Sequence, residues 1–520
     1  MTPTVTELLL NRAKDEHCGL RFEDRSWSWA EVVRTSAQYA SLLRSLRGPG
    51  PFHVGVLLGN VPEFAFLLGG AALSGAVLVG LNPTRRGEAL ARDVRLTDCQ
   101  VILTDSAHAD LLAGLDLGVP VLLVDTPPWS ALLAEHAGAE IAPVATDPDD
   151  LLVLVFTSGT GGDPKAVRCT HGKIAFPGRM LADRFELTSD DVAYVAMPLF
   201  HSNALMAGWA VGLAAGATIA LRRRFSASGF LPDVREFGVT YANYVGKPLS
   251  HVLATAPRPD DADNPLRVVY GNEANEQDVR RFAERFGCRV VDGFGSTEGG
   301  IAIPRTPDTP PGALGRLPDG VAVLDPDTGK PCATAEFSAE GQLLNPGEAI
   351  GELVNTTGSG WFAGYYNAPD ADADRMRDGM YWSGDLAYLD AEGFCHFAGR
   401  TADWLRVDGE NLATAPIERI LLRHPEIREA AVYAVPDPKT GDQVMATLVT
   451  TPAFTPAELA DFLADQPDLG PKQWPRYIRL ATDLPRTATH KILKRHLMTE
   501  ALNTQDPVYH REDSTYVPRP

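Results

Sequence analysis

The chain has 520 residues, too many for one hydrophobic core, so at least two domains are expected. Apolar residues make up 44% and charged residues 22%, which is ordinary for a folded protein and argues against disorder. The formal net charge of −20 argues against a nucleic-acid partner, because most of such a surface would repel a phosphate backbone.

Short apolar runs rich in β-branched residues recur along the first three hundred residues. They lie at 53–58, 101–105, 119–125, 151–156, 192–198, 267–271 and 289–295. Helical patterns separate most of them, for example from Gln277 to Phe286. This alternation predicts an α/β fold with largely parallel, buried sheets.

The uncharged stretch from Phe64 to Leu81 is long enough to suggest a membrane span. It is rich in Gly and Ala, however, and Ser74-Gly75 interrupts it. We therefore expect a buried helix that ends near Ser74, followed by a short strand from Ala76 to Val79.

The pattern changes in the second half of the chain. Gly, Asn and Thr accumulate from about Glu336 to Gly364, which predicts loops or an antiparallel β subdomain. After the linker, a small α+β domain is expected, with a helix that starts at Thr455-Pro456. We expect an N-terminal domain at 1–399, a hinge at 400–403 and a C-terminal domain at 404–520, whose last residues from Asn503 form a mobile tail.

The six cysteines are scattered and form no Cys-x-x-Cys pair. This argues against a zinc site or a disulfide framework and suits a reducing compartment. The N-terminal residues lack the pattern of a secretory signal. A cytoplasmic protein is therefore expected; peripheral membrane contact and a homo-oligomer stay open.

The strongest local signal runs from Thr157 to Lys165 (TSGTGGDPK) and directly follows the buried run at 151–156. Its glycines allow a ligand to approach the backbone closely, and its hydroxyls and amides can hold phosphate oxygens. A Walker-type loop is excluded because Pro164 precedes the lysine and Ala166 follows it. The pattern therefore predicts a phosphate-binding loop of another kind.

This loop resembles that of the acyl-adenylate-forming superfamily, which includes acyl-CoA synthetases, adenylation domains and luciferases. Four further blocks follow in the order typical of that superfamily. They are 197–203 (MPLFHSN), 271–273 (GNE), 292–299 (DGFGSTEG) and 381–385 (YWSGD). A linker block opens at Gly399-Arg400, and 484–491 (LPRTATHK) closes the series.

The resemblance implies a set of site residues. Those expected to bind ATP or AMP are Thr157, Ser158, Gly159, Thr160, Gly161, Lys165, Gly271, Asn272, Glu273, Asp292, Gly293, Phe294, Gly295, Ser296, Asp385 and Arg400. Within this set, Phe294 would stack on adenine and Asp385 would accept hydrogen bonds from the ribose hydroxyls. Mg²⁺ is the implied cofactor, with Thr157 and Glu298 as its expected ligands.

The implied catalytic residues are Lys491, Glu298, His201 and Thr297. His201 would lie beside the acyl carboxylate, and Thr297 would contact the α-phosphate. Lys491 would neutralise the charge that develops when a carboxylate attacks that phosphate.

The hinge and coenzyme A segment is expected at Ala402, Asp403, Gly409, Glu410 and Asn411. Two departures from the common pattern, His490 before the lysine and Ala402 in the linker, resemble the very-long-chain acyl-CoA synthetase and fatty-acid-transport-protein branch. Within it, the chain looks most like actinobacterial fatty-acid–CoA ligases, some of which serve sterol breakdown. The implied reaction joins a carboxylic acid, ATP and coenzyme A into acyl-CoA, AMP and pyrophosphate.

The resemblance favours a long-chain fatty or steroid carboxylate as the acid. The Ala- and Gly-rich segment after His201 could leave room for such a ligand, or could instead allow close helix packing. Two alternatives to the reaction stay open: an acyl-AMP ligase that loads a carrier protein, and a silent fatty-acid binding or transport protein.

Overall fold

The computed structural model describes residues 2–157, 164–274, 276–339, 341, 343–400, 404–407, 410–437, 441–486, 492–512 and 515–519. The chain divides into two compact units. Unit 1 comprises Met1–Gly299 and Trp361–Ala373, and unit 2 comprises Gly300–Gly360 and Asp374–Pro520. These units are defined by contacts within the chain. The expected hinge at 400–403 is a point of movement between domains, which such contacts do not test, so it stays a prediction.

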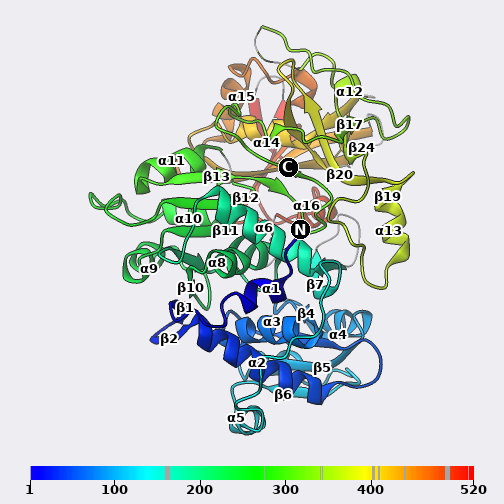
Figure 1. Ribbon diagram of the computed structural model, residues 1–520. Coiled ribbons are helices and arrows are strands. Elements are labelled where there is room, and N and C mark those ends of the chain that lie inside the picture. The colour runs from blue at the N-terminus through cyan, green and yellow to red at the C-terminus, as the bar shows by residue number, and fades with distance from the viewer. Residues whose placement is uncertain are drawn as a thin grey trace. The chain divides into compact units, whose positions relative to one another are not determined.

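Unit 1 contains two sheets whose strands are mainly parallel, which confirms the expected α/β class (Figure 1). Sheet A has the order β13-β12-β11-β9-β10-β1-β2, and only its edge pair β1/β2 is antiparallel. Its strands are β1 Cys18–Phe22, β2 Arg25–Ser28, β9 Val192–Val195, β10 Thr218–Leu221, β11 Tyr241–Val245, β12 Val268–Asn272 and β13 Arg289–Asp292.

Sheet B has the order β6-β5-β3-β4-β7-β8, with β7/β8 as its only antiparallel pair. Its strands are β3 His53–Leu57, β4 Val77–Gly80, β5 Cys99–Thr104, β6 Val121–Leu123, β7 Leu151–Thr157 and β8 Lys165–Thr170. Five of these six strands correspond to apolar runs or short strands that the sequence predicts.

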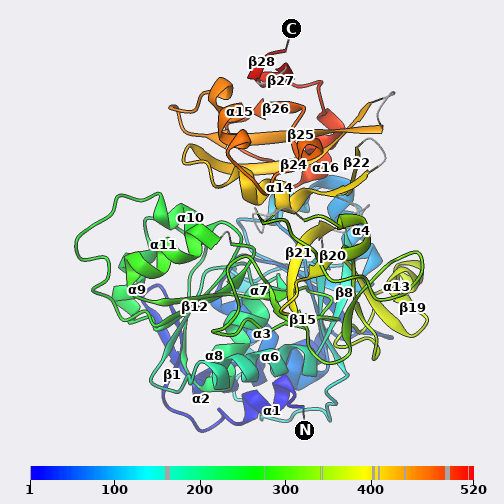
Figure 2. The same ribbon diagram turned by 90° about the horizontal axis from the view of Figure 1, so that it is seen from above.

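Helices cover both faces of sheet A. On one face, α9, α10 and α11 enclose a core with Tyr194, Ala242 and Val269 of the sheet. On the other, α6, a π-helical turn and α8 pack against Ala193 and Tyr241, and α6 and α8 lie side by side (Figure 2). The helices of unit 1 are α1 Val5–Leu10, α2 Trp29–Leu46, α3 Pro62–Ser74, α4 Gly87–Leu96, α5 Pro127–Ala134, α6 His171–Arg184, α7 Ser202–Ala204, the π-helical turn Leu205–Trp209, α8 Ala210–Ala215, α9 Phe230–Phe237, α10 Pro248–Leu253 and α11 Glu276–Phe286.

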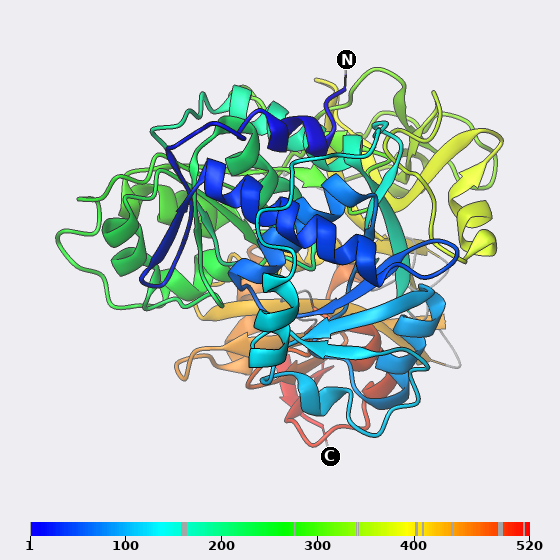
Figure 3. The same ribbon diagram turned by 60° about the horizontal axis from the view of Figure 1, so that its bottom comes forward.

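The apolar stretch from Phe64 to Leu81 folds as expected into helix α3 and strand β4. The helix ends at Ser74 because Gly75 adopts a left-handed conformation at its C-cap. Helix α2 packs along α3 (Figure 3). Two small residues of α3 allow the close approach: a Cβ on Gly69 would lie 2.2 Å from Ser36 Oγ, and one on Gly70 would lie 2.8 Å from Tyr39 Cβ. Among the described helices, none is both long and apolar enough to cross a membrane.

Unit 2 contains two further sheets. The first is antiparallel, with the order β16-β21-β20-β18-β17 and β19 beside β20, as the composition near residues 336–364 suggests in part. The second has the order β23-β22-β25-β26-β27-β28 and carries β24 beside β25. Their strands are β16 Gly315–Arg316, β17 Val321–Leu324, β18 Gly351–Asn355, β19 Met376–Arg377, β20 Met380–Leu389, β21 Phe394–Arg400, β22 Trp404–Val407, β23 Glu410–Ala413, β24 Ile427–Asp437, β25 Gly441–Thr450, β26 Tyr477–Leu480, β27 Val508–Glu512 and β28 Thr515–Pro518.

The helices of unit 2 are α12 Pro346–Ala349, α14 Thr414–Leu421, α15 Pro456–Ala464 and α16 Lys494–Glu500, while α13 Pro369–Arg375 belongs to both units. Helix α15 begins after Thr455 as predicted. The expectation of a mobile tail from Asn503 is wrong. Strands β27 and β28 form a hairpin on the sheet edge, where Tyr516 is 2% exposed and donates a hydrogen bond to the Pro475 carbonyl at 2.7 Å.

Candidate active site

The two ends of the predicted phosphate loop lie opposite each other. Strands β7 and β8 are antiparallel and their register pairs Thr157 with Lys165. Lys165 Nζ lies 5.2 Å from the ring centroid of Tyr365, a cation–π distance. The loop between them, with the predicted Ser158, Gly159, Thr160 and Gly161, lies outside the described residues. The structure therefore places the two flanking residues of this motif and no more.

His201 stands where a strand-to-helix connection enters α7. Its Nε2 atom is buried and has no hydrogen-bond partner among the residues that the structure describes. Burial lowers the pKa of this imidazole to about 4, so the ring is neutral near pH 7. A neutral, buried ring with an unsatisfied nitrogen has the chemistry to accept or donate one hydrogen bond to a ligand.

The next residue joins two of the predicted motifs. Ser202 Oγ lies 2.7 Å from Thr297 Oγ1, a contact between residues 95 positions apart. The hydrogen bond brings the block at 197–203 to the block at 292–299. Thr297 and His201 therefore come from adjoining segments of unit 1.

Two segments predicted to bind the nucleotide, 271–273 and 292–295, occupy the carboxyl ends of neighbouring parallel strands; we call them the adenine segments. Strands β12 and β13 pair Gly271 with Asp292, so Gly271–Glu273 and Asp292–Gly295 leave sheet A side by side. Asn272 Nδ2 donates to the Gly293 carbonyl at 2.7 Å. Ligands of open α/β sheets bind at this edge, which supports the predicted position of the nucleotide.

Strand β11 supports these segments from the other side. Tyr244 Oη donates to Asp292 Oδ1 at 2.6 Å, and the Ala274 amide donates to the same oxygen at 3.1 Å. A Cβ on Gly271 would lie only 2.2 Å from the Tyr244 carbonyl oxygen, so any side chain at this position would force the backbone to shift. Sequence reasoning did not identify Tyr244 as a supporting residue.

Glu298 is held by two hydrogen bonds from residues far away in the sequence. Tyr365 Oη donates to its Oε1 at 3.0 Å, and Lys173 Nζ donates to its backbone carbonyl at 2.8 Å. Neither partner was predicted from sequence. The scarcity of lysine, nine in the chain, is the one signal that could have drawn attention to Lys173.

The carboxylate of Glu298 fits a magnesium ion that arrives with a nucleotide. The described residues contain no group of three or more His, Cys, Asp or Glu side chains able to hold a metal. Mg²⁺ commonly takes one or two carboxylates together with phosphate oxygens rather than a cage of protein ligands. The single carboxylate of Glu298 matches that pattern.

Unit 2 places two further predicted residues together. Strands β20 and β21 pair Asp385 with Arg400, and Arg400 Nε lies 3.4 Å from Asp385 Oδ1. Gly384, at φ 74° within strand β20, donates its amide to Glu352 Oε1 at 2.6 Å, which fixes the backbone just before Asp385. Asp385 and Arg400 are therefore neighbours, as a shared role at one nucleotide would require.

Several predicted residues cannot be placed. Ala402, Asp403, Gly409 and Lys491 lie outside the described residues. Glu410 and Asn411 belong by their backbone to strand β23, which pairs with β22. The predicted roles of these hinge, coenzyme A and catalytic residues stay predictions.

The small residues after His201 serve close packing. A Cβ on Gly212 would lie 2.5 Å from Ile219 Cγ1, and one on Gly208 would lie 2.9 Å from Asn243 Oδ1. A Cβ on Gly178 of α6 would lie 2.7 Å from the Ala210 backbone of α8. The Ala- and Gly-rich segment therefore fits the second of its two expected uses, close helix packing.

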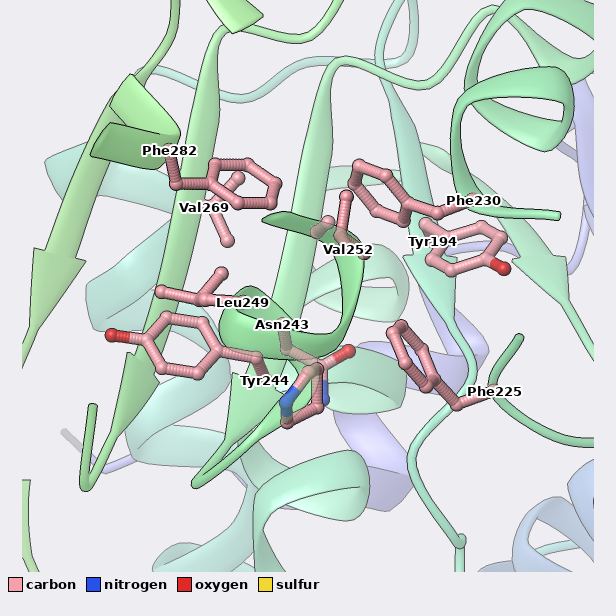
Figure 4. Close-up of a pocket in the computed structure, with 11 residues that line it drawn as sticks. Tyr194, Phe225, Phe230, Asn243, Tyr244, Leu249, Val252, Val269 and Phe282 are labelled. Atoms are coloured by element: carbon pink, nitrogen blue, oxygen red, sulfur yellow. The ribbon is translucent and has the colours of Figure 1, made fainter. Parts of the chain in front are cut away.

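A small apolar pocket lies on the other face of sheet A (Figure 4). Its volume of about 10 Å³ is enough for about one water molecule. It is lined by Tyr194, Phe225, Phe230, Ala242, Asn243, Tyr244, Pro248, Leu249, Val252, Val269 and Phe282. The pocket has no space for an acyl chain as it stands.

Comparisons with known proteins agree with these motifs. Residues 10–366 match the family "AMP-binding enzyme", and residues 416–491 match "AMP-binding enzyme C-terminal domain". The chain is 54% identical to the medium/long-chain-fatty-acid–CoA ligase FadD17 of Mycobacterium marinum, over 99% of both chains. It is 50% identical to the steroid-22-oyl-CoA synthetase of Rhodococcus jostii, over 97% of this chain and 92% of the relative.

Solved structures show the same fold. ATP-bound MatB from Rhodopseudomonas palustris aligns with a TM-score of 0.83 at 24% identity, over 96% of this chain and 99% of MatB. The o-succinylbenzoate coenzyme A synthetase of Bacillus subtilis, solved with ATP and magnesium, aligns with a TM-score of 0.77 at 25% identity, over 94% and 98%. From the family match across most of its length and its full-length relatives, the chain belongs to the AMP-binding enzyme family.

Proposed function

We propose that this enzyme is an ATP-dependent acyl-CoA ligase. It would convert a carboxylic acid, ATP and coenzyme A into acyl-CoA, AMP and pyrophosphate through an acyl-adenylate. The observation that carries the proposal is the similarity at 50–55% identity, over more than nine-tenths of each chain, to proteins named as CoA ligases or CoA synthetases. The motif residues would supply the chemistry that this reaction needs.

In the first half-reaction, a carboxylate oxygen attacks the α-phosphorus of ATP and pyrophosphate leaves. His201 is neutral, so it can donate one N–H to the acyl carboxylate without an ion pair. Thr297, held by Ser202, is proposed to contact the α-phosphate. Asp385 would accept hydrogen bonds from the ribose hydroxyls, and Phe294 would stack on the adenine.

Two anions must meet in this step, and positive charge lowers its barrier. Glu298 and Thr157 are the proposed ligands of Mg²⁺, which when bound would neutralise charge on the phosphates. Lys491 is proposed to neutralise the transferring phosphoryl group in the same step. Losing one such group typically costs on the order of 10²–10³ in rate.

In the second half-reaction, the thiol of coenzyme A attacks the acyl carbonyl and AMP leaves. The proposed hinge at 400–403 would move Lys491 away and bring Gly409, Glu410 and Asn411 into use. This proposal rests on family resemblance, since Asp403 and Lys491 lie outside the described residues.

The proposed acyl group is a long-chain fatty or steroid carboxylate. The names of the relatives support it: FadD17 is called a medium/long-chain-fatty-acid–CoA ligase, and the Rhodococcus relative a steroid-22-oyl-CoA synthetase. The packing of Gly208 and Gly212 gives no independent support. The proposed compartment is the cytoplasm. All six cysteines are free thiols, not joined in disulfides, which supports it.

The test is a product analysis with defined acids. Purified enzyme is incubated with MgATP, coenzyme A and either acetate, octanoate, palmitate or a C24 steroid acid, and the products are separated by mass spectrometry. We expect acyl-CoA and AMP in equal amounts, with the long or steroid acids preferred. Transfer of the acyl group to a carrier protein but not to coenzyme A would support the carrier-loading alternative. If no acid causes release of pyrophosphate, a silent binding protein would be supported.

A further inference from the structure

We propose that Tyr365 and Lys173 are positioning residues that hold Glu298 in the orientation required by the metal–nucleotide complex. The inference rests on the proposed function, because it assumes that Glu298 is a ligand of Mg²⁺. It adds two residues that lie outside the motifs from which the site was predicted. Both act on the same glutamate, one on its side chain and the other on its main chain.

Tyr365 fixes the carboxylate. Its hydroxyl donates to Glu298 Oε1 at 3.0 Å, and its ring is buried, with 4% of the residue exposed. A hydrogen bond to one carboxylate oxygen limits rotation about the last side-chain bond, which sets the direction of both oxygens. Partners of this kind orient metal ligands in many proteins.

The tyrosine is itself held in place by its backbone. Its amide donates to Asp372 Oδ1 at 2.7 Å, and it forms an isolated β-bridge with Val167 of strand β8. The preceding residue, Gly364, accepts a hydrogen bond from the Arg168 amide at 3.0 Å. Strand β8 begins at Lys165, whose ammonium lies over the same ring. Tyr365 therefore connects the end of the predicted phosphate loop to the proposed metal ligand.

Lys173 fixes the main chain. It lies in the first turn of α6 and is 3% exposed. Its Nζ donates to the Glu298 carbonyl at 2.8 Å and to the Arg168 carbonyl at 3.2 Å. Burial lowers the pKa of this ammonium, so the position is a costly one for a lysine. Its hydrogen bonds join strand β8 to the segment that carries Glu298.

The backbone turn after Glu298 passes close to the aliphatic part of the Lys173 side chain. Gly299 has φ 73°, and a Cβ at this position would lie 3.1 Å from Lys173 Cε and 3.1 Å from Trp361 Cβ. The left-handed glycine thus lets the backbone turn directly over the lysine. With both its carbonyl and its carboxylate bonded, Glu298 is presented to a ligand with little freedom left.

The experiment measures binding rather than turnover. The probe is α,β-methylene ATP, which cannot release pyrophosphate, and its dissociation constant is determined calorimetrically with Mg²⁺ and with EDTA. The ratio of the two constants is the metal-dependent gain in affinity, a coupling between metal and nucleotide. The dissociation constant of AMP without metal reports damage to the rest of the nucleotide site.

Three variants and two controls are compared with the wild type. Glu298→Gln removes the proposed ligand, while Tyr365→Phe and Lys173→Met remove the two positioning groups. Tyr366→Phe is the matched control for the tyrosine, because its hydroxyl donates to Asp98 instead. Lys14→Met is the control for the lysine, since Lys14 is exposed.

We expect Glu298→Gln to abolish the metal-dependent gain. Tyr365→Phe and Lys173→Met should each reduce it about tenfold, within the 10- to 100-fold range typical of second-sphere partners, with AMP affinity and the two controls unchanged. A gain that falls with Glu298→Gln but not with the other two would overturn the positioning roles and leave the metal role intact. An unchanged gain in Glu298→Gln would overturn the metal role itself. A parallel loss of AMP affinity would show a merely structural role, and if Lys173→Met does not fold, Tyr365→Phe decides.

Discussion

Gly271→Ala probes how closely the backbone of the predicted adenine segment approaches its neighbour. The added Cβ would lie 2.2 Å from the Tyr244 carbonyl oxygen and 2.6 Å from Tyr244 Cδ1. The strand pairing of Tyr244 with Gly271 keeps the backbone oxygen from moving away easily. Tyr244 also holds Asp292 through its hydroxyl, so a shift of the tyrosine would disturb both adenine segments at once.

The size of the effect follows from these contacts. Overpacking costs roughly 1–3 kcal/mol, and weakening a hydrogen bond to a charged group costs about 1.5–3 kcal/mol. If about 1.4 to 2.8 kcal/mol of this appears in nucleotide binding, affinity falls about ten- to hundredfold. We expect the KM for MgATP and the dissociation constant of AMP to rise together by that factor, because both ligands share the adenine.

The assay is pyrophosphate release at varied ATP, with AMP binding measured by calorimetry and folding checked by urea unfolding. Gly59→Ala is the control, because the nearest heavy atom to its added Cβ is 3.8 Å away in the same unit. It should change neither constant by more than about twofold. Wild-type ATP and AMP constants in a stable Gly271→Ala protein would refute the idea that close approach to Tyr244 shapes this site.

Three further predictions address other parts of the site. Lys491→Ala should cripple adenylation by on the order of 10²–10³ but still convert synthetic acyl-adenylate and coenzyme A into thioester; equal losses in both half-reactions would contradict its assigned role. Asp403→Pro should spare one half-reaction and collapse the other, because proline restricts the backbone at a hinge, and unchanged thioester turnover would count against a pivot there. The pKa of His201 is about 4 in the folded chain and about 6.5 in the unfolded chain. As pH drops, the unfolded chain therefore takes up the proton first, and the free energy of unfolding decreases between about pH 6.5 and 4. Urea unfolding of His201→Asn should therefore show a smaller acid loss than the wild type, and identical pH slopes would argue against a neutral, buried ring.

Much of the fold could be predicted because the local patterns agree with the tertiary structure. The stretch from Phe64 to Leu81 shows this: its length allowed a span, but Ser74-Gly75 marked the end of a helix, and Gly75 does adopt the left-handed cap. The tail after Asn503 shows the opposite case. Its residues are polar and carry no strong strand pattern, and they form a hairpin because the edge of β26 offers unpaired backbone groups.

The site was predicted only where its residues lie inside contiguous motifs. Thr297, Glu298 and Asp385 could be proposed as site residues because the chemistry and the local sequence coincide. The contacts that orient them join distant segments: Lys173 and Glu298 are 125 residues apart, and Tyr365 and Glu298 are 67 apart. Such pairs leave no periodic pattern in a single sequence, so they become visible only when the chain folds.

The most direct test of the central claim follows the oxygen atoms of the acid. The enzyme is given palmitate or a C24 steroid acid labelled with ¹⁸O in both carboxylate positions, together with MgATP and coenzyme A, and AMP and the thioester are analysed by mass spectrometry. If the carboxylate attacks the α-phosphorus, AMP carries one ¹⁸O and the thioester carbonyl keeps the other. Label in inorganic phosphate with formation of ADP, or unlabelled AMP beside labelled acyl-CoA, would contradict an acyl-adenylate route.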